Sequence, residues 1–226
     1  MSRELSGLPF GSTLARIRQL AEAHGDPITA HEQAEADRVR EAVDRRAARL
    51  RAAGLLDPEA VAACASVEAS GRCPRVDGHP GSEAASSAVE SWLADEQLRT
   101  LALLGPTGRG KSFASTWVLA EQAGAWLSAI ECRVGGWDDL RPRAVSARLL
   151  VLDDLGREGS EWAARELADV LELRHNRGLR TLVTSNLTAE RIADRYGERV
   201  SSRWSDGRFT RIVPVLGPDL RARGGR

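Results

Sequence analysis

The sequence predicts an α/β protein whose parallel sheet is covered by helices on both faces and is preceded by a small helical region. Two observations predict this fold: from residue 88 onward strand-like apolar runs alternate with helical segments, whereas residues 1–87 show helical periodicity without a strong strand signal. Residues 70–87 are rich in Gly, Pro and Ser and are interpreted as a linker. We therefore expect a helical N-terminal region and linker at 1–87 and an α/β domain at 88–226.

In the N-terminal region, apolar side chains recur at helical spacing over two stretches, 14–21 and 39–50, and the second stretch ends near Gly54. Two Asp-Pro pairs, Asp26-Pro27 and Asp57-Pro58, are typical of helix starts, because Asp caps the first N–H groups and Pro needs no hydrogen bond in the first turn. Amphipathic helices of this kind suit docking to a partner, and packing on their own domain is the alternative.

The α/β domain is predicted from its alternating pattern. Residues 148–156 form an apolar run typical of a strand that is buried on both faces. In chain order, the expected elements are a helix at 89–98, a strand at 100–104, a helix at 111–123, strands at 125–132 and 148–156, a helix at 161–176 and a strand at 179–187. This alternation implies a three-layer α/β/α arrangement around a parallel sheet.

A glycine-rich loop connects the first strand of this domain to its helix. Gly105-Pro106-Thr107-Gly108-Arg109-Gly110-Lys111-Ser112 matches G-x-x-x-x-G-K-S/T in the strand–loop–helix setting that this phosphate-binding motif requires. Glycines let successive backbone N–H groups point at phosphate oxygens, and the helix N-terminus adds partial positive charge. The motif predicts a P-loop NTPase in which these residues and the adjoining Phe113 bind a nucleotide and Ser112 ligates Mg²⁺.

Lys111 is the only lysine among the 32 basic residues of the chain. A compact ammonium on a flexible stem fits the narrow space between a P-loop and the β- and γ-phosphates, and a planar guanidinium does not. The same count bears on the nucleotide, because GTPases usually read guanine with an N-K-x-D loop and no second lysine exists here. ATP is therefore the expected nucleotide.

Two further polar clusters follow buried strands. Asp153 is expected to hold Mg²⁺, and Asp154 stands where a carboxylate can orient the attacking water. Asn186 follows the next strand and offers an amide to the γ-phosphate and to that water. Isolated acids at a strand end are often merely solvated, but this order after a P-loop favours a catalytic interpretation and is typical of NTPases of the ASCE type.

These ordered motifs, together with the run 149–204 and the segment "GPDLR" at 217–221, resemble the ATPase domain of the DnaC/IstB-like family over roughly residues 88–223. Members are AAA+ ATPases that load replicative helicases or assist transposases. The resemblance implies that Asn186 is the sensor-1 residue, that Arg203 is the arginine finger for a neighbouring subunit's nucleotide, and that Arg221 is the sensor-2 arginine. Arg199 is an alternative finger, and an exposed helix face is the other interpretation of both arginines.

Two departures from the family pattern affect these expectations. Many ATPases of this class have Glu where this chain has Asp154, and the shorter side chain predicts slow hydrolysis. The stretch 133–147, which supplies channel-facing helices in the family, is short. Its arginines, Arg133, Arg141 and Arg143, either contact nucleic-acid phosphates or form a solvated face.

The motifs therefore predict an ATPase that uses ATP and Mg²⁺. The resemblance implies that it forms a homo-oligomer with nucleotide at subunit interfaces and loads a replicative helicase onto single-stranded DNA. A helper ATPase of a transposase shares every motif. A small-molecule kinase is less favoured, because it would show an arginine-rich lid and an acceptor pocket. A further alternative is a protein that binds ATP as a conformational switch and does not hydrolyse it.

Composition narrows the remaining possibilities. The formal net charge is zero, so the total charge indicates neither nucleic acid nor membrane as a partner. Three irregularly spaced cysteines fit a reducing compartment, and without a leader pattern or a long apolar run we expect a cytoplasmic protein. Cys64, Cys73 and His79 lack the tight spacing that structural zinc favours, so ordinary thiols are the preferred interpretation over a zinc site.

Overall fold

A computed structural model describes residues 30–66, 72–133 and 136–224. The predicted helical stretch at 14–21 and the pair Asp26-Pro27 lie outside these residues. All strand pairs of the five-stranded sheet are parallel, and the strand order is β2-β3-β4-β1-β5. The strands are β1 (Thr100–Leu104), β2 (Ala125–Ser128), β3 (Leu149–Leu155), β4 (Arg180–Ser185) and β5 (Thr210–Pro214).

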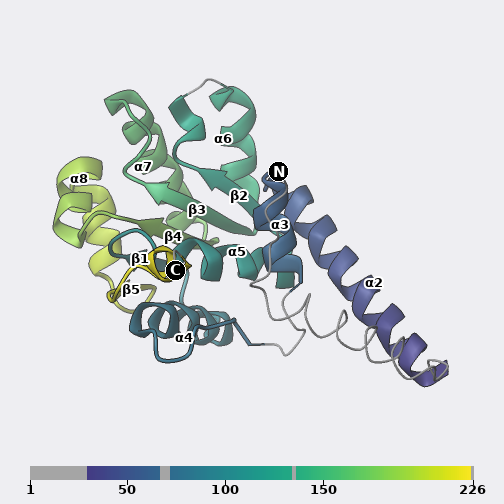
Figure 1. The fold of residues 1–226 in the computed structure, drawn as a ribbon. Coiled ribbons are helices and arrows are strands. Elements are labelled where there is room, and N and C mark those ends of the chain that lie inside the picture. Colours follow the sequence, from purple (N-terminus) through teal and green to yellow (C-terminus); the bar gives the residue numbers. More distant parts are fainter. Residues whose placement is uncertain (1–29, 67–71, 134–135, 225–226) are drawn as a thin grey trace, which may run out of the picture.

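Helices cover both faces of the sheet, which confirms the predicted three-layer α/β/α fold (Figure 1). Side chains of β1 alternate between two apolar cores: Leu101 and Leu103 belong to one, and Ala102 and Leu104 to the other. The first core is shared with α4 (Pro80–Ala94) and α5 (Lys111–Glu121), and the second with α6 (Trp137–Ser146), α7 (Glu161–Asn176) and α8 (Ala189–Ser205).

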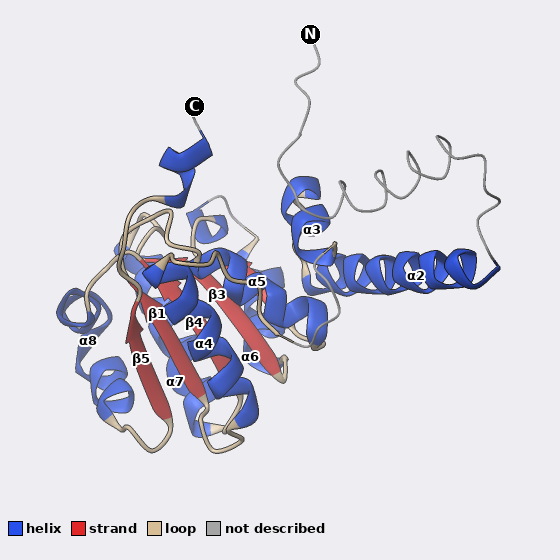
Figure 2. Cartoon of the chain, turned by 60° about the horizontal axis from the view of Figure 1, so that its bottom comes forward, coloured by secondary structure: helices blue, strands red, loops and turns tan. Residues whose placement is uncertain are grey.

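The N-terminal helices α2 (Ala30–Ala53) and α3 (Pro58–Ala65) pack against α5, and α2 extends from there away from the sheet (Figure 2). Arg49 of α2 donates to the carbonyl oxygens of Ala120 and Glu121, so it satisfies the C-terminal end of α5. Asp57 caps α3 and Pro58 is its first residue, as the sequence predicts. None of the helices in the described part of the chain is long and apolar enough to cross a membrane.

The linker predicted at 70–87 is wrong in its second half, because α4 begins at Pro80 and runs through the predicted boundary at 87/88. His79 caps this helix, accepting a hydrogen bond at Nδ1 from the Ser82 N–H (3.0 Å). The small residues of the segment serve close packing: a Cβ on Gly81 would meet the Leu216 carbonyl oxygen at 2.6 Å. In this segment, Gly, Pro and Ser therefore belong to the start of a helix that packs closely against the chain at Leu216.

Smaller differences concern strand and helix limits. The helix expected at 89–98 ends at Ala94, and the strand expected at 125–132 ends at Ser128, followed by a 3-10 turn at Glu131–Arg133. The edge strand β5 is absent from the sequence prediction. It ends at Pro214, which an edge strand tolerates because the missing N–H does not break an interior ladder.

Candidate functional site

The loop 105–110 follows β1 and turns sharply into α5 at the carboxyl end of the sheet. Gly105, Gly108 and Gly110 all have positive φ, which side chains with a Cβ rarely adopt. A Cβ on Gly105 would meet the Val215 carbonyl oxygen at 2.2 Å. Gly110 leaves the start of α5 without a side-chain cap, so the first N–H groups of that helix are available to an anion.

The ammonium of Lys111 lies at the centre of this end of the sheet. Its Nζ donates to the carbonyl oxygens of Gly105 (2.6 Å) and Pro106 (2.7 Å) and to Oδ1 of Asn186 (3.1 Å). Burial lowers the pKa of Lys111, while the carboxylates of Asp154 and Asp153 raise it. The lone lysine therefore joins the glycine-rich loop to the end of β4 and lies within the field of both acids.

Ser112 and Asp153 form a pair of oxygen ligands beside Lys111. The Ser112 hydroxyl donates to Oδ1 of Asp153 (2.9 Å), and the Thr184 hydroxyl donates to the same oxygen (2.5 Å). Burial raises the pKa of Asp153, and the hydrogen bonds from Thr184 and Ser112 oppose that shift. Hydroxyl and carboxylate oxygens are the ligand type that Mg²⁺ prefers.

Within the described ranges, no group of three or more His, Cys, Asp or Glu side chains could hold a metal ion. This donor set still fits Mg²⁺, because that ion is commonly bound by one or two protein oxygens together with substrate phosphates. Ser112 and Asp153 thus suit an ion that arrives with a nucleotide.

Asp154 adopts an unusual backbone conformation. Its φ of +57° makes it the only residue other than glycine with positive φ in the part of the chain that the structure describes. Its carboxylate is paired with Arg157 at 3.2 Å and lies close enough to Lys111 to raise the pKa of that ammonium. Asp154 therefore lies beside Lys111 at this end of the sheet.

A segment that we call the C-terminal strap, residues 215–221, crosses the glycine-rich loop. The Leu220 N–H donates to the Gly108 carbonyl (2.8 Å), and Nε2 of the fully buried His79 contacts the Pro218 carbonyl (2.8 Å). Since His79 Nδ1 is an acceptor, Nε2 carries the proton and donates. The strap brings Arg221 near Lys111, whose pKa its charge lowers, and Arg221 itself is paired with Asp219 at 3.6 Å.

Sequence reasoning missed three residues of this site. The sequence patterns assign no role at this site to Thr184, His79 or Asp219. A carboxylate oxygen of Asp219 occupies the space that a Cβ on residue 108 would need. The Asp219 side chain can therefore lie here only because residue 108 is glycine. Pro80 could have indicated the start of α4, because a proline in the first turn is half of the signal that identified Asp57-Pro58.

Arg203 lies outside this cluster. It is an exposed residue near the end of α8 and lines a small cavity with Thr100, the first residue of β1, and His175. The glycine-rich loop follows the last residue of β1, so Arg203 stands near the opposite end of that strand. Arg199 is paired with Glu172 at 3.6 Å. Neither arginine is brought to Lys111 within one chain.

Arg141 and Arg143, two of the arginines in the stretch 133–147, have structural partners within the chain. Arg141 pairs with Glu166 at 3.2 Å, and Arg143 donates to the Ala52 carbonyl at the end of α2 (2.9 Å). Arg143 therefore anchors the N-terminal region, and Arg133 ends the 3-10 turn.

Cys64 and Cys73 are buried free thiols, and burial raises the pKa of Cys73 to about 11. Both ring nitrogens of His79 are already engaged in hydrogen bonds.

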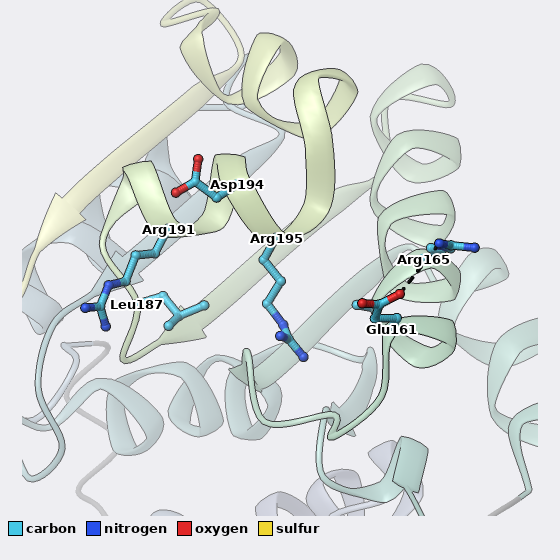
Figure 3. Close-up of a pocket in the computed structure, with 7 residues that line it drawn as sticks. Glu161, Arg165, Leu187, Arg191, Asp194 and Arg195 are labelled. Atoms are coloured by element: carbon cyan, nitrogen blue, oxygen red, sulfur yellow. Dashed lines mark ion pairs between the residues drawn. The ribbon is translucent and has the colours of Figure 1, made fainter.

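A cavity of about 470 Å³ lies between α7 and α8 (Figure 3). Arg191 and Arg195 project from α8 on either side of Leu187, while Arg165 of α7 is paired with Glu161. Arg195 is paired with the fully buried Glu158, and Asp194 adds a further negative charge to the lining. Because acids balance these arginines, the cavity lacks the excess positive charge of a phosphate site.

Comparison with protein-family models finds no match, and neither does comparison with curated proteins. Solved structures do match. DnaI is 20% identical with a TM-score of 0.53, over 62% of this chain and 88% of that one. The DnaC helicase loader is 19% identical with a TM-score of 0.52, over 63% and 93%. AMPPCP-bound DnaA from Aquifex aeolicus is 20% identical with a TM-score of 0.50, over 62% and 49%. The chain thus has a DnaC-like AAA+ P-loop NTPase fold.

Proposed function

We propose that this chain binds ATP with Mg²⁺, hydrolyses it slowly, and acts in DNA replication by loading a replicative helicase onto single-stranded DNA. The observation that carries the ATPase part is the arrangement around Lys111, whose ammonium contacts the glycine-rich loop and Asn186 beside the Ser112–Asp153 pair. Helicase loading is supported by the fold shared with the DnaC helicase loader and by the resemblance of the ordered motifs to that family. The fold shared with AMPPCP-bound DnaA supports an adenine nucleotide.

Phosphate binding would use the backbone N–H groups of the loop and the uncapped start of α5. Lys111 already has its ammonium over this loop, so it would turn from the carbonyls of Gly105 and Pro106 to phosphate oxygens. Ser112 and Asp153 would hold Mg²⁺. When bound, Mg²⁺ supplies positive charge that offsets the negative charge of the phosphate oxygens.

Hydrolysis requires a positioned water and stabilisation of the charge that develops on the transferred phosphoryl group. Asp154 would accept a hydrogen bond from the attacking water and orient it. Asn186, already in contact with Lys111, would donate its amide N–H to the γ-phosphate side of the site. Because the Asp154 side chain is one methylene shorter than the usual glutamate, we expect a low turnover rate.

Arg203 would complete the site of a second copy of the chain. An arginine that approaches the γ-phosphate from a partner stabilises the transition state by adding positive charge where negative charge develops. The position of Arg203 near the far end of β1 supports this assignment, because it does not reach the Lys111 cluster of its own chain. A homo-oligomer with nucleotide at subunit interfaces follows from the proposal.

Two experiments test this function. The first measures phosphate release with Mg²⁺-ATP, with and without single-stranded DNA. Turnover in the wild type that is lost in Asp154→Asn supports the ATPase, whereas no turnover under either condition leaves an ATP-binding switch.

The second experiment uses Asp154→Asn protein, which should retain ATP, as bait for partner proteins. Recovery of a replicative helicase, dependent on ATP and lost with the binding-deficient Lys111→Ala variant, supports helicase loading. Recovery of a transposase instead would favour the transposase-helper alternative.

A further inference from the structure

The two acids of the site, Asp153 and Asp154, lie at an irregularity in the sheet. β3 pairs with β4 in regular register up to Leu152 and Val183, and pairing resumes at Leu155 and Ser185. Two residues of β3 therefore stand opposite the single residue Thr184. This arrangement is a β-bulge, and the positive φ of Asp154 belongs to it.

The bulge explains how adjacent acids can serve one site. Successive side chains of a regular strand point to opposite faces of the sheet, so Asp153 and Asp154 in an unbroken strand would point apart. A bulge interrupts that alternation and re-aims side chains. Here the Asp153 carboxylate meets the Ser112 hydroxyl, and both acids lie close enough to Lys111 to raise its pKa.

Thr184 occupies the position opposite the bulge and is fully buried. Its hydroxyl oxygen accepts the Asp154 N–H (3.0 Å), a backbone donor displaced from regular pairing. The same hydroxyl donates its proton to Oδ1 of Asp153 (2.5 Å). The hydroxyl accepts one of these bonds and donates the other, whereas valine, which has nearly the same shape, can do neither.

We propose that Thr184 is a positioning residue that fixes both acids of the site, setting the Asp153 carboxylate beside Ser112 for Mg²⁺ and holding the bulged backbone of Asp154. This inference rests on the proposed function, since it concerns Mg²⁺ bound with ATP. Thr184 itself touches no phosphate in this account; it acts through the two carboxylates.

The alternative is a purely structural role for a buried threonine, and three variants separate the two. Thr184→Val removes the hydroxyl and keeps the shape. Thr184→Ser keeps the hydroxyl. Thr100→Val makes the same change at another buried threonine, at the opposite end of the neighbouring strand β1. Thermal melts report whether each variant folds, and Thr184→Ala is read in the same way as Thr184→Val if the valine variant does not fold.

Calorimetric titration with AMPPCP, in EDTA and then across a series of Mg²⁺ concentrations, gives the decisive readout. In Thr184→Val we expect the Mg²⁺ concentration for half-maximal gain in affinity to rise by about 10-fold, the usual effect of losing a group that orients a metal ligand. Affinity in EDTA should match the wild type. Thr184→Ser and Thr100→Val should show the wild-type Mg²⁺ dependence.

A folded Thr184→Val variant with the wild-type Mg²⁺ dependence would overturn the inference and leave the proposed function intact. A Thr184→Ser variant as impaired as Thr184→Val would also overturn it, because the hydroxyl would then not be the active group. Absence of AMPPCP binding by the wild-type chain would remove both the inference and the proposed function.

Discussion

The two ends of strand β1 carry different kinds of charge. At the carboxyl end, Lys111 is buried and joined to the glycine-rich loop and to Asn186. At the amino end, roughly 13 Å away for a five-residue strand, Arg203 is exposed beside Thr100. The carboxyl end of β1 therefore resembles a phosphate-binding site, whereas the amino end carries a solvent-exposed cation, Arg203. In the function proposed above, a second copy of the chain brings the two ends together.

The largest effect on turnover should come from a substitution at the amino end of β1, where Arg203 is exposed. In our account Arg203→Ala removes the charge that a second copy contributes, and arginine fingers are worth about 10³-fold in turnover. Phosphate release should fall by that factor while AMPPCP affinity stays near the wild-type value. Arg199→Ala, one helical turn earlier, is the matched control and should retain most turnover. If Arg199→Ala loses turnover and Arg203→Ala keeps it, the finger is Arg199.

Lys111→Arg tests the buried end of the strand. The change conserves charge, but a planar guanidinium does not fit the space that Lys111 fills between two carbonyl oxygens. We expect turnover to fall by about 10²-fold, as when one preorganised donor is lost, and nucleotide affinity to fall with it. Near-wild-type kinetics of a folded Lys111→Arg protein would show that shape at this position does not matter.

Arg174, which also lies toward the amino end, distinguishes structure from function there. It is fully buried and donates to four neutral oxygens: Thr181 Oγ1 and the carbonyls of Ala144, Ala147 and Arg180. Arg174→Met leaves these acceptors unpaired, so the free energy of unfolding should fall by about 2 kcal/mol. Urea unfolding measures it. Arg165→Met on the exposed face of α7 should cost under about 0.5 kcal/mol, and equal costs would refute this role of Arg174.

The smallest effect concerns the C-terminal strap. His79→Asn keeps an oxygen that can cap α4 but cannot reach the Pro218 carbonyl. Loss of one hydrogen bond, about 1 kcal/mol, should lower the melting temperature by about 2–4 °C and weaken AMPPCP binding by at most about 5-fold. Unchanged affinity would mean that the strap does not support the nucleotide site.

Much of the fold follows from local sequence patterns. The predicted limits of α7, 161–176, are those observed, and the Ser160 side chain caps its start. β3 was predicted from its continuous apolar run, which is typical of a strand buried on both faces, and β1 and β4 from the alternation of strands and helices. The glycine-rich loop and its lysine were equally clear, because so few residue types can fill those positions.

Features that depend on distant segments escaped prediction. The sequence predicts a linker over the first half of α4, because the close approach of Gly81 to the strap cannot be seen in the sequence. The bulge at Asp153-Asp154 depends on the register between β3 and β4, and the amino-acid sequence of each strand does not determine that register. For the same reason Thr184 was not recognised as the residue opposite both acids.

The most direct test of the central claim is phosphate release by an equal mixture of Lys111→Ala and Arg203→Ala chains. Each variant alone should be nearly inactive. In a mixed assembly, the intact Lys111 site of one variant can meet the intact Arg203 of the other, so the mixture should recover a measurable part of wild-type turnover. A mixture no more active than the two variants measured separately, under conditions where the wild type is active, would contradict completion of the site by a second copy.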